Sequence, residues 1–101
     1  MARDVVLVTK RTSRQNMYFV YLLQSNLDNS LYIGYTTNIK QRLGKHNSKQ
    51  VLSTKNKAPW KLIFFEAFIN RLDAKNREVY LKSGWGRKTL RNLLKRSLIG
   101  N

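Results

Sequence analysis

The chain has 101 residues, 42% of them hydrophobic and 11% aromatic, which is enough for one domain with a core and too short for two. Twenty Lys and Arg against five Asp and Glu give a net charge of +15, which predicts salt-dependent binding to nucleic acid, with an anionic membrane surface as the alternative. The absence of cysteine excludes disulfides and makes a zinc finger implausible, and a single histidine excludes a histidine-rich metal site.

The first residues differ from the rest of the chain. In residues 1–16 basic side chains surround a short apolar patch, Val5 to Val8, which is too short for the apolar region of a signal peptide. We expect residues 1–16 to be an appended basic extension with poor order, and the regular domain to occupy residues 17–98.

Two strands are expected next. Residues 18–23 are apolar, aromatic and β-branched, which predicts a strand buried on both faces. Polar residues 26–30 supply turn chemistry, and residues 31–35 read as a second strand. The pair predicts an antiparallel hairpin, in which Tyr21 and Tyr32 would sit across from each other.

A helix should follow the hairpin. Thr37 or Asn38 can cap it, and the pattern carries it to about Asn47. Arg42 and His46 are four residues apart, so a helix places both side chains on one face.

The second half of the chain predicts one strand and two helices. Residues 47–59 read as a basic loop and residues 60–68 as a third strand. A second helix should begin at Asp73 and end at Ser83-Gly84, followed by a last helix over residues 87–98. This last helix is expected to turn three leucines inward, Leu90, Leu93 and Leu94. The predicted order is β-β-α-β-α-α, an α+β fold.

A few residues have the chemistry that phosphodiester hydrolysis needs. Arg42 can hold two phosphate oxygens, and His46 can exchange a hydrogen bond or a proton near neutral pH. Glu78 is either a helical ion-pair partner of Lys82 or the single carboxylate ligand of a mostly hydrated Mg²⁺. Each residue also has an ordinary interpretation: a surface arginine, a helix-end histidine, a packed tyrosine. The few acids argue against a two-metal nuclease.

The order of these residues carries a resemblance. Phe19-Val20-Tyr21 and Tyr32-Ile33-Gly34, followed by Arg42, His46 and Glu78, resemble the GIY-YIG nuclease superfamily, above all its small stand-alone single-domain proteins. Three further segments are similar to that group: Pro59-Trp60-Lys61-Leu62, Arg77-Glu78 and Leu81-Lys82-Ser83-Gly84. The likeness runs from Met17 to about Leu94. It implies a three-stranded antiparallel sheet flanked by helices.

The resemblance also implies roles. Tyr32 matches the tyrosine that acts as general base or orients the attacking water, and Tyr21 matches the tyrosine that supports it by hydrogen bonding. Arg42 matches the arginine that stabilises the charge on the phosphorane. Glu78 matches the glutamate that binds Mg²⁺ or another divalent cation.

Two further positions complete the expected site. Gly34 would let the substrate or a neighbouring segment approach closely, and His46 matches a position near the nucleophile. The chain departs from the family pattern at Phe19 and Val20, which replace a glycine and an isoleucine. A family lysine that follows the second motif has its nearest counterpart in Lys40, so proton transfer would depend more on Tyr32 and His46.

The expected function is a one-metal endonuclease that acts on nucleic acid, DNA rather than RNA, in the cytoplasm. The alternatives are a catalytically inactive nucleic-acid-binding module on the same scaffold, and a basic protein-interaction or membrane-surface domain. Without a targeting domain, sequence selectivity should be weak, or should come from a partner or from a nucleic-acid structure. Five basic residues are expected to contact nucleic acid: Lys40, Lys45, Lys55, Lys57 and Arg87.

Overall fold

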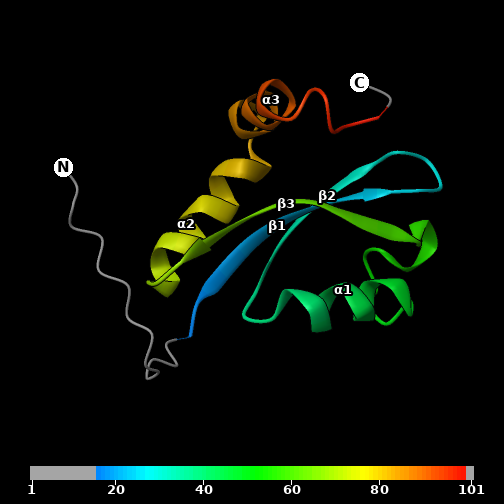
Figure 1. Cartoon of the computed structure of the whole chain (residues 1–101), viewed down its shortest axis with the longest axis horizontal. Coiled ribbons are helices and arrows are strands. Elements are labelled where there is room, and N and C mark those ends of the chain that lie inside the picture. The colour runs from blue at the N-terminus through cyan, green and yellow to red at the C-terminus, as the bar shows by residue number, and fades with distance from the viewer. Residues whose placement is uncertain (1–15, 100–101) are drawn as a thin grey trace, which may run out of the picture.

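The computed structural model describes residues 16–99. Within them the elements confirm the predicted α+β fold and its order (Figure 1). In chain order they are β1 (Tyr18–Ser25), β2 (Leu31–Thr36), α1 (Ile39–Asn47), the 3₁₀ turn η1 (Lys55–Lys57), β3 (Trp60–Phe68), α2 (Arg71–Lys82) and α3 (Gly84–Leu93). The extension predicted for residues 1–16 lies, except for Asn16, outside this range.

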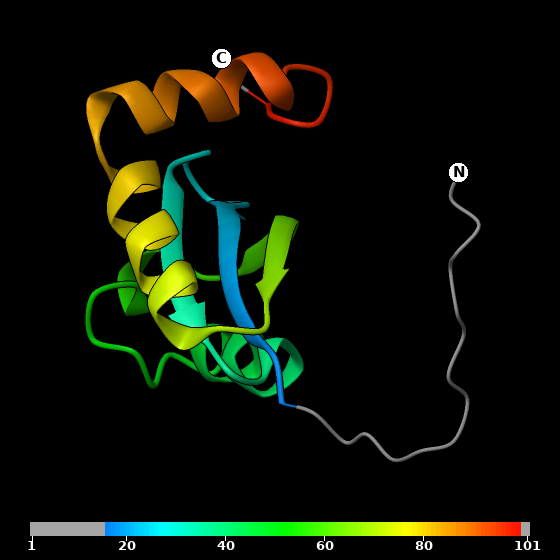
Figure 2. The same cartoon turned by 90° about the vertical axis from the view of Figure 1, so that its left-hand side faces the viewer.

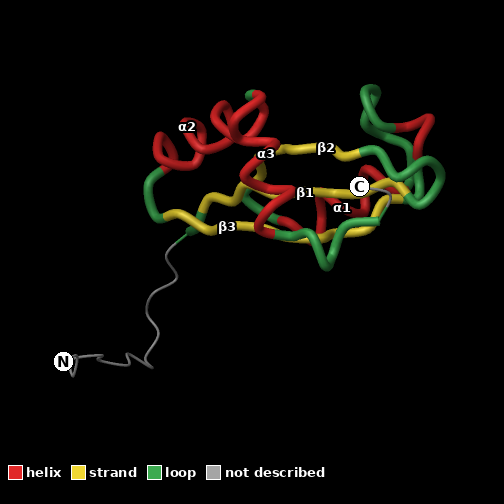
Figure 3. Tube along the Cα trace, turned by 90° about the horizontal axis from the view of Figure 1, so that it is seen from above, coloured by secondary structure: helices red, strands yellow, loops and turns green. Residues whose placement is uncertain are grey.

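The three strands form one antiparallel sheet with β1 in the centre, in the order β2-β1-β3 (Figure 3). In the apolar run over residues 18–23, residues 20–23 are buried, as predicted for a strand covered on both faces, whereas Tyr18 and Phe19 are half-buried. Burial continues through Gln24 and Ser25 at the end of β1. Successive side chains of a strand point to opposite faces. The central strand therefore supplies side chains to two separate clusters.

The helices divide between the two faces of the sheet. In Figure 1, α2 and α3 lie above it and α1 lies below it. The face under α2 and α3 is apolar, with seven buried residues: Val20, Leu22, Ile33, Ala74, Leu81, Leu90 and Leu98. The face under α1 has a smaller cluster of Tyr21, Leu23 and Trp60, with Tyr32 packed against it. The two tyrosines of the candidate site thus lie on the α1 side.

Two helix starts differ from the prediction, in both cases because of a capping side chain. Helix α2 begins at Arg71 rather than at Asp73, because the Asn70 side chain accepts a hydrogen bond from the backbone N–H of Leu72. Helix α3 begins at Gly84, because Ser83 Oγ accepts from the N–H of Gly86 at 3.1 Å.

The prediction that three leucines of the last helix face the core is correct for two of them. Leu90 is buried and Leu94 packs against the core, but Leu93 is 59% exposed. The helix ends at Leu93, five residues before the predicted end, and a turn carries the chain back so that Leu98 is buried. Leu94 and Leu98 therefore reach the core from a turn rather than from a helix.

Helices α2 and α3 meet at a sharp corner, and α3 runs across the end of the molecule (Figure 2). Gly86 lies directly on the last turn of α2. A Cβ at this position would overlap Tyr80 O and lie 2.5 Å from Leu81 Cα. The glycine therefore sets how closely the two helices approach.

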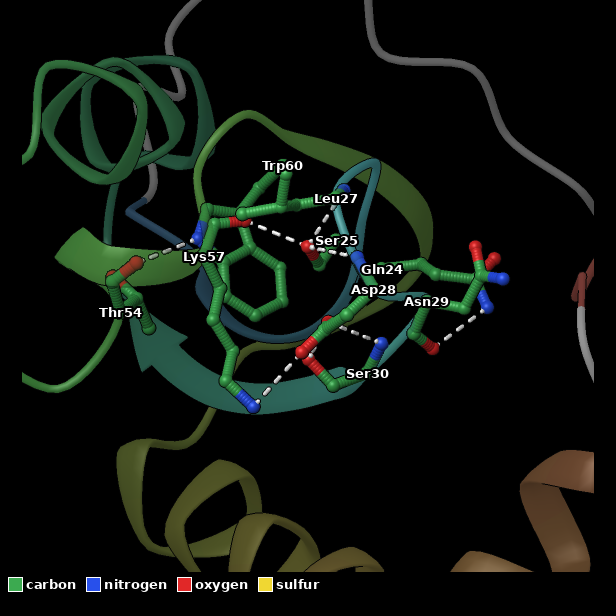
Figure 4. Close-up of polar contacts among 9 residues, drawn as sticks. All are labelled: Gln24, Ser25, Leu27, Asp28, Asn29, Ser30, Thr54, Lys57 and Trp60. Carbon is green, nitrogen blue, oxygen red and sulfur yellow. Dashed lines mark hydrogen bonds and ion pairs between the residues drawn. The ribbon is translucent and has the colours of Figure 1, made fainter.

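The turn between β1 and β2 is tied to the loop that leads into β3 (Figure 4). Ser25 Oγ donates to Lys57 O at 2.6 Å and accepts from the backbone N–H groups of Leu27 and Asp28. Lys57 Nζ lies 3.1 Å from Asp28 Oδ2. Two chain segments far apart in sequence are thereby fixed to each other.

Within the described residues, no helix has the length and apolarity that a bilayer crossing requires.

Candidate active site

The Tyr21 phenol is placed by its strand pairing. Tyr21 of β1 is paired with Gly34 of β2, and its ring lies directly over that glycine. A Cβ on Gly34 would overlap the phenol oxygen and lie 2.5 Å from Cζ. The close approach predicted for Gly34 is therefore occupied by a neighbouring side chain, and the glycine is needed to seat the Tyr21 ring.

A buried hydrogen-bond chain extends from this phenol. Tyr21 Oη lies 2.8 Å from His46 Nε2, and His46 Nδ1 lies 2.7 Å from Thr54 Oγ1. His46 is fully buried, and Thr54 is 1% exposed. Burial, with a smaller effect of the Arg42 charge, lowers the pKa of His46 to about 4, so the imidazole is neutral at pH 7. A neutral imidazole has one N–H, so one ring nitrogen donates and the other accepts.

We assign the direction of this chain from the charge beside it. Burial raises the pKa of Tyr21 to about 12, although Arg42 acts to lower it, so the phenol keeps its proton. The Arg42 cation favours acceptance at the phenol oxygen, which directs the Tyr21 proton to Nε2 of His46. Nδ1–H then donates to Thr54. In this arrangement His46 positions Tyr21 and has both nitrogens engaged.

Tyr32 joins the same cluster by ring contacts. Its ring centroid is 5.0 Å from that of His46 and 6.3 Å from that of Tyr21. The two tyrosines are not directly across from each other, as the hairpin predicted, because Tyr32 is paired with Leu23 and Tyr21 with Gly34. They are diagonal neighbours on one face, a distance that aromatic side chains can bridge.

Arg42 reaches the cluster from α1 with an unsatisfied group. Its Nε is buried and has no hydrogen-bond partner among residues 16–99. Buried polar groups without a partner are rare in native structures and call for an explanation. The guanidinium also lies close enough to Tyr21 and His46 to lower the pKa of both. The site therefore has a free charged donor beside two phenols.

Glu78 affects the Tyr21 cluster through its charge, and it forms ion pairs with lysines of α2. It lies on α2, opposite α1, yet its charge contributes to the raised pKa of Tyr21. Its carboxylate pairs with Lys82 at 3.0 Å, the predicted helical ion pair, and with Lys75 at 3.5 Å. Lys75 Nζ lies 4.4 Å from the Tyr35 ring centroid, which places this group beside the edge strand β2.

The five basic residues expected to bind nucleic acid are all exposed but do not form one group. Lys40 and Lys45 lie on α1, and Lys55 and Lys57 on η1. Arg87 lies on α3, on the other side of the sheet. Lys57 is also engaged in the ion pair with Asp28, whose pKa is held below its usual range chiefly by hydrogen bonds from Ser30.

This arrangement agrees with a known domain. Residues 17–92 match the family model described as the GIY-YIG catalytic domain. The chain belongs to the GIY-YIG family. The match covers the sheet, α1, α2, all of α3 except Leu93, and every residue of the candidate site.

Several UPF0213 proteins are similar to this chain in sequence. UPF0213 protein YsiG of Lactococcus lactis is 42% identical over 85 residues, which is 83% of this chain and 81% of that protein. A UPF0213 protein of Haloquadratum walsbyi is 37% identical over 65% of this chain and 74% of its own length. The solution NMR structure of UPF0213 protein BH0048 of Bacillus halodurans is 31% identical, with a TM-score of 0.49 over 76% of this chain and 84% of that one.

The GIY-YIG domain implies nuclease-type chemistry on a nucleic acid, and nucleases of this family use a divalent cation. The described residues contain no group of three or more His, Cys, Asp or Glu side chains that could hold a metal ion. Mg²⁺ keeps several waters and needs only one or two carboxylates in addition to substrate phosphates. Glu78, whose side chain is 14% exposed, fits the part of a single protein ligand, in competition with Lys75 and Lys82.

The sequence does not identify Thr54 as part of the candidate site, and it marks Trp60 only within a family-like segment. Thr54 lies in a loop whose polar residues look alike, and nothing local marks it as the partner of His46. Trp60 fixes it: Trp60 Nε1 donates to Thr54 O at 3.1 Å, and Asn47 brackets the Trp60 backbone with two hydrogen bonds, of 2.6 and 3.0 Å. The sequence features that could have pointed to this contact are Asn47, directly after His46, and Trp60, directly after Pro59.

Proposed function

We propose that this protein is an endonuclease that hydrolyses phosphodiester bonds, in DNA rather than RNA, by a one-metal mechanism. Tyr32 orients or deprotonates the attacking water, and Arg42 stabilises the negative charge that develops on phosphorus. Tyr21 is held by His46 and supports Tyr32 and the substrate by hydrogen bonding. Glu78 is the protein ligand of the metal.

The observation that supports this proposal most directly is the unpartnered Arg42 Nε. A guanidinium forms strong, paired hydrogen bonds with phosphate oxygens. A phosphate bound beside Tyr21 would satisfy the buried donor at the place where charge develops during the reaction. Fixed donors aimed at that charge are a major source of rate enhancement in enzymes.

The hydrogen-bond chain supports a division of work between the tyrosines. Tyr21 has a raised pKa and, in the direction assigned to the chain, donates to a neutral imidazole, so it is suited to holding its position and not to removing a proton. Tyr32 contacts the same imidazole only through its ring face or edge. The Tyr32 hydroxyl is therefore the group that we assign to orienting or deprotonating the attacking water.

The metal, when bound at Glu78, would neutralise charge on the phosphate and on the leaving oxygen. Glu78 would have to exchange its contacts with Lys75 and Lys82 for this role. The two lysines would then be available to the substrate backbone.

The test is metal-dependent cleavage of a labelled DNA panel: single-stranded, duplex, flap and branched. We expect cleavage by the wild-type chain with Mg²⁺ and a loss of at least a hundredfold in Arg42→Ala, in line with the removal of one transition-state donor in other enzymes. Arg42→Lys should stay low, because a lysine keeps the charge but not the fork of donors.

Arg71→Ala is the matched control, because Arg71 is exposed and lies on α2 outside the cluster. Cleavage that is equally fast in the Arg42 and Arg71 variants would contradict the proposal. Glu78→Gln tests the metal role separately. It should keep the fold and the binding of DNA while cleavage is lost, and unchanged cleavage would remove Glu78 from the mechanism.

One observation favours a second candidate, a binding module without catalysis. Both carboxylate oxygens of Glu78 are paired with lysines, which leaves a metal to compete with two fixed cations. Such a module would bind the same panel with strong salt dependence and show no turnover that depends on Arg42. The cleavage panel therefore separates the two candidates.

A further inference from the structure

A hollow of about 510 Å³ lies between the start of β2 and helix α3. Its floor is apolar, formed by Leu31 and Ile33 of β2 and Leu90 of α3. The volume falls in the range typical of small-molecule and nucleotide sites. Its floor lies on the face of the sheet opposite to the cluster under α1, because Ile33 and Leu90 belong to the core on that face.

The rim of the hollow is strongly basic. Lys82, Arg87 and Arg91 line it, and none of its lining residues is acidic. Arg87 has no ion pair with any acid of residues 16–99 and is exposed. An apolar floor with a cationic rim suits a ligand that has a flat or apolar part and a negative charge.

The walls of the hollow are held in place. On one side Asn29 and Ser30 of the β1–β2 turn line it, and Figure 4 shows how that turn is tied down. Gln24 Nε2 donates to Asn29 O at 3.1 Å, and Ser30 Oγ donates to Asp28 Oδ1 at 2.6 Å. On the other side, the α2–α3 corner at Gly86 holds α3 against α2. A site with fixed walls loses little entropy when a ligand binds.

The hollow touches the candidate active site at two places. Tyr32, assigned above to the attacking water, is one of its lining residues. Lys82, another lining residue, is paired with Glu78 at 3.0 Å. The edge strand β2 therefore has the catalytic cluster on one face and the hollow next to it.

We propose that this hollow binds the nucleotide adjacent to the scissile phosphate, on the strand that is cut. Its phosphate contacts Arg87, and its sugar and base pack on Leu31, Ile33 and Leu90. This inference rests on the proposed function, because it places the strand by the position of Tyr32 and Glu78. It predicts that the enzyme holds one single-stranded nucleotide beside the cut.

The test uses a fluorescent thymidine decanucleotide without divalent cation, so that binding is measured in the absence of cleavage. Wild-type, Arg87→Ala, Arg87→Lys and Arg71→Ala chains are titrated at several salt concentrations. Arg87→Ala should bind about tenfold more weakly, the loss of one charged hydrogen bond, and its log–log salt slope should fall by about 0.7. Arg87→Lys should restore the slope, and Arg71→Ala should match wild type.

A second measurement locates the ligand. Methyl NMR signals of Ile33 and Leu90 should move on titration with the decanucleotide, and thymidine 5′-monophosphate alone should bind at least tenfold more weakly. Equal affinities of the Arg87 and Arg71 variants, or unmoved Ile33 and Leu90 methyls, would overturn the proposal. Equally tight binding of the monophosphate would also overturn it, in favour of a small-molecule site.

The two proposals fail in different ways. If the chain cleaves no substrate but Arg87→Ala still weakens decanucleotide binding, the hollow stands as a nucleotide site and the nuclease proposal falls. If cleavage depends on Arg42 while Arg87 has no effect on binding, the reverse holds.

Discussion

The two faces of the sheet are built on different principles. The face under α2 and α3 is packed with aliphatic side chains such as Leu22 and Leu81, whose burial stabilises the fold without fixing direction. The face under α1 buries a tyrosine, a histidine and a threonine in one hydrogen-bond chain. Hydrogen bonds contribute less net stability than aliphatic burial but fix geometry. Substitutions on the first face should reduce stability, and those on the second should change the chemistry.

The largest effect is expected on the aliphatic face. Leu81→Ala removes a side chain that is 2% exposed and should lower the free energy of unfolding by about 2–5 kcal/mol. Urea denaturation followed by circular dichroism measures it. Leu93→Ala, at an exposed position of α3, should change stability by less than about 0.5 kcal/mol. Similar losses in both variants would show that the described core is wrong.

The pH dependence of stability tests the α1 face. The folded pKa of His46 is about 4, below the usual 6.5, so between these values the unfolded chain binds more protons than the folded one. Stability is then fully present above pH 6.5 and falls as the pH drops towards 4, by up to about 3 kcal/mol. Urea midpoints at pH 7, 6, 5 and 4 measure the fall, which should flatten in His46→Gln.

An independent check needs no variant. The ring protons of His46, the only histidine of the chain, should show no titration near pH 6.5 in the folded protein. A normal titration there would contradict the buried chain with Tyr21 and Thr54.

Gly34→Ala tests how the Tyr21 ring is seated. The added methyl group overlaps the phenol, so we expect a loss of about 1–3 kcal/mol and a displaced ring. Gly44→Ala is the matched control with the opposite sign. A Cβ at Gly44 meets nothing within 4 Å, and this helical position should gain about 0.5–1 kcal/mol. Thermal unfolding of both variants measures these changes. A change of the same sign in both would contradict the close contact between Gly34 and the Tyr21 ring.

Apart from the control variants, the smallest expected change in stability is that of Thr54→Val. The valine keeps the shape but leaves His46 Nδ1 without its partner, which should cost about 1–2 kcal/mol. Nitrogen NMR shifts of the imidazole should report a mixed tautomer, and Thr54→Ser should restore the single one. Thr37→Val, at an exposed position, should change neither. An unchanged tautomer in Thr54→Val would remove Thr54 from the chain.

Much of the fold was predictable because its signals are local. The strand over residues 60–68 and the helix ending at Asn47 were predicted at their observed bounds, from a run of strand formers and from the cap at Asn38. Leu93 was misplaced because helical spacing gives a stripe of apolar residues, while the end of the helix depends on tertiary contacts. Capping by Asn70 and Ser83 shifted two helix starts by a few residues.

The candidate site was predictable as a set of residues but not as a geometry. The spacing of Arg42 and His46 placed them together, and the resemblance supplied Tyr21, Tyr32 and Glu78. The diagonal offset of the tyrosines depends on the register, which the turn after Ser25 sets. Thr54 depends on a contact between a loop and a helix, for which a sequence has no local signature.

Ser83 is at once the C-cap of α2 and the N-cap of α3, since its Oγ donates to Tyr80 O at 2.6 Å and accepts from the N–H of Gly86. The helix that bears Glu78 and the helix that bears Arg87 thus share one residue and no linker. A residue inserted there would rotate α3 by roughly a quarter turn or more, because each helical residue turns the chain by about 100°. The corner is therefore a place where the length of the chain is fixed.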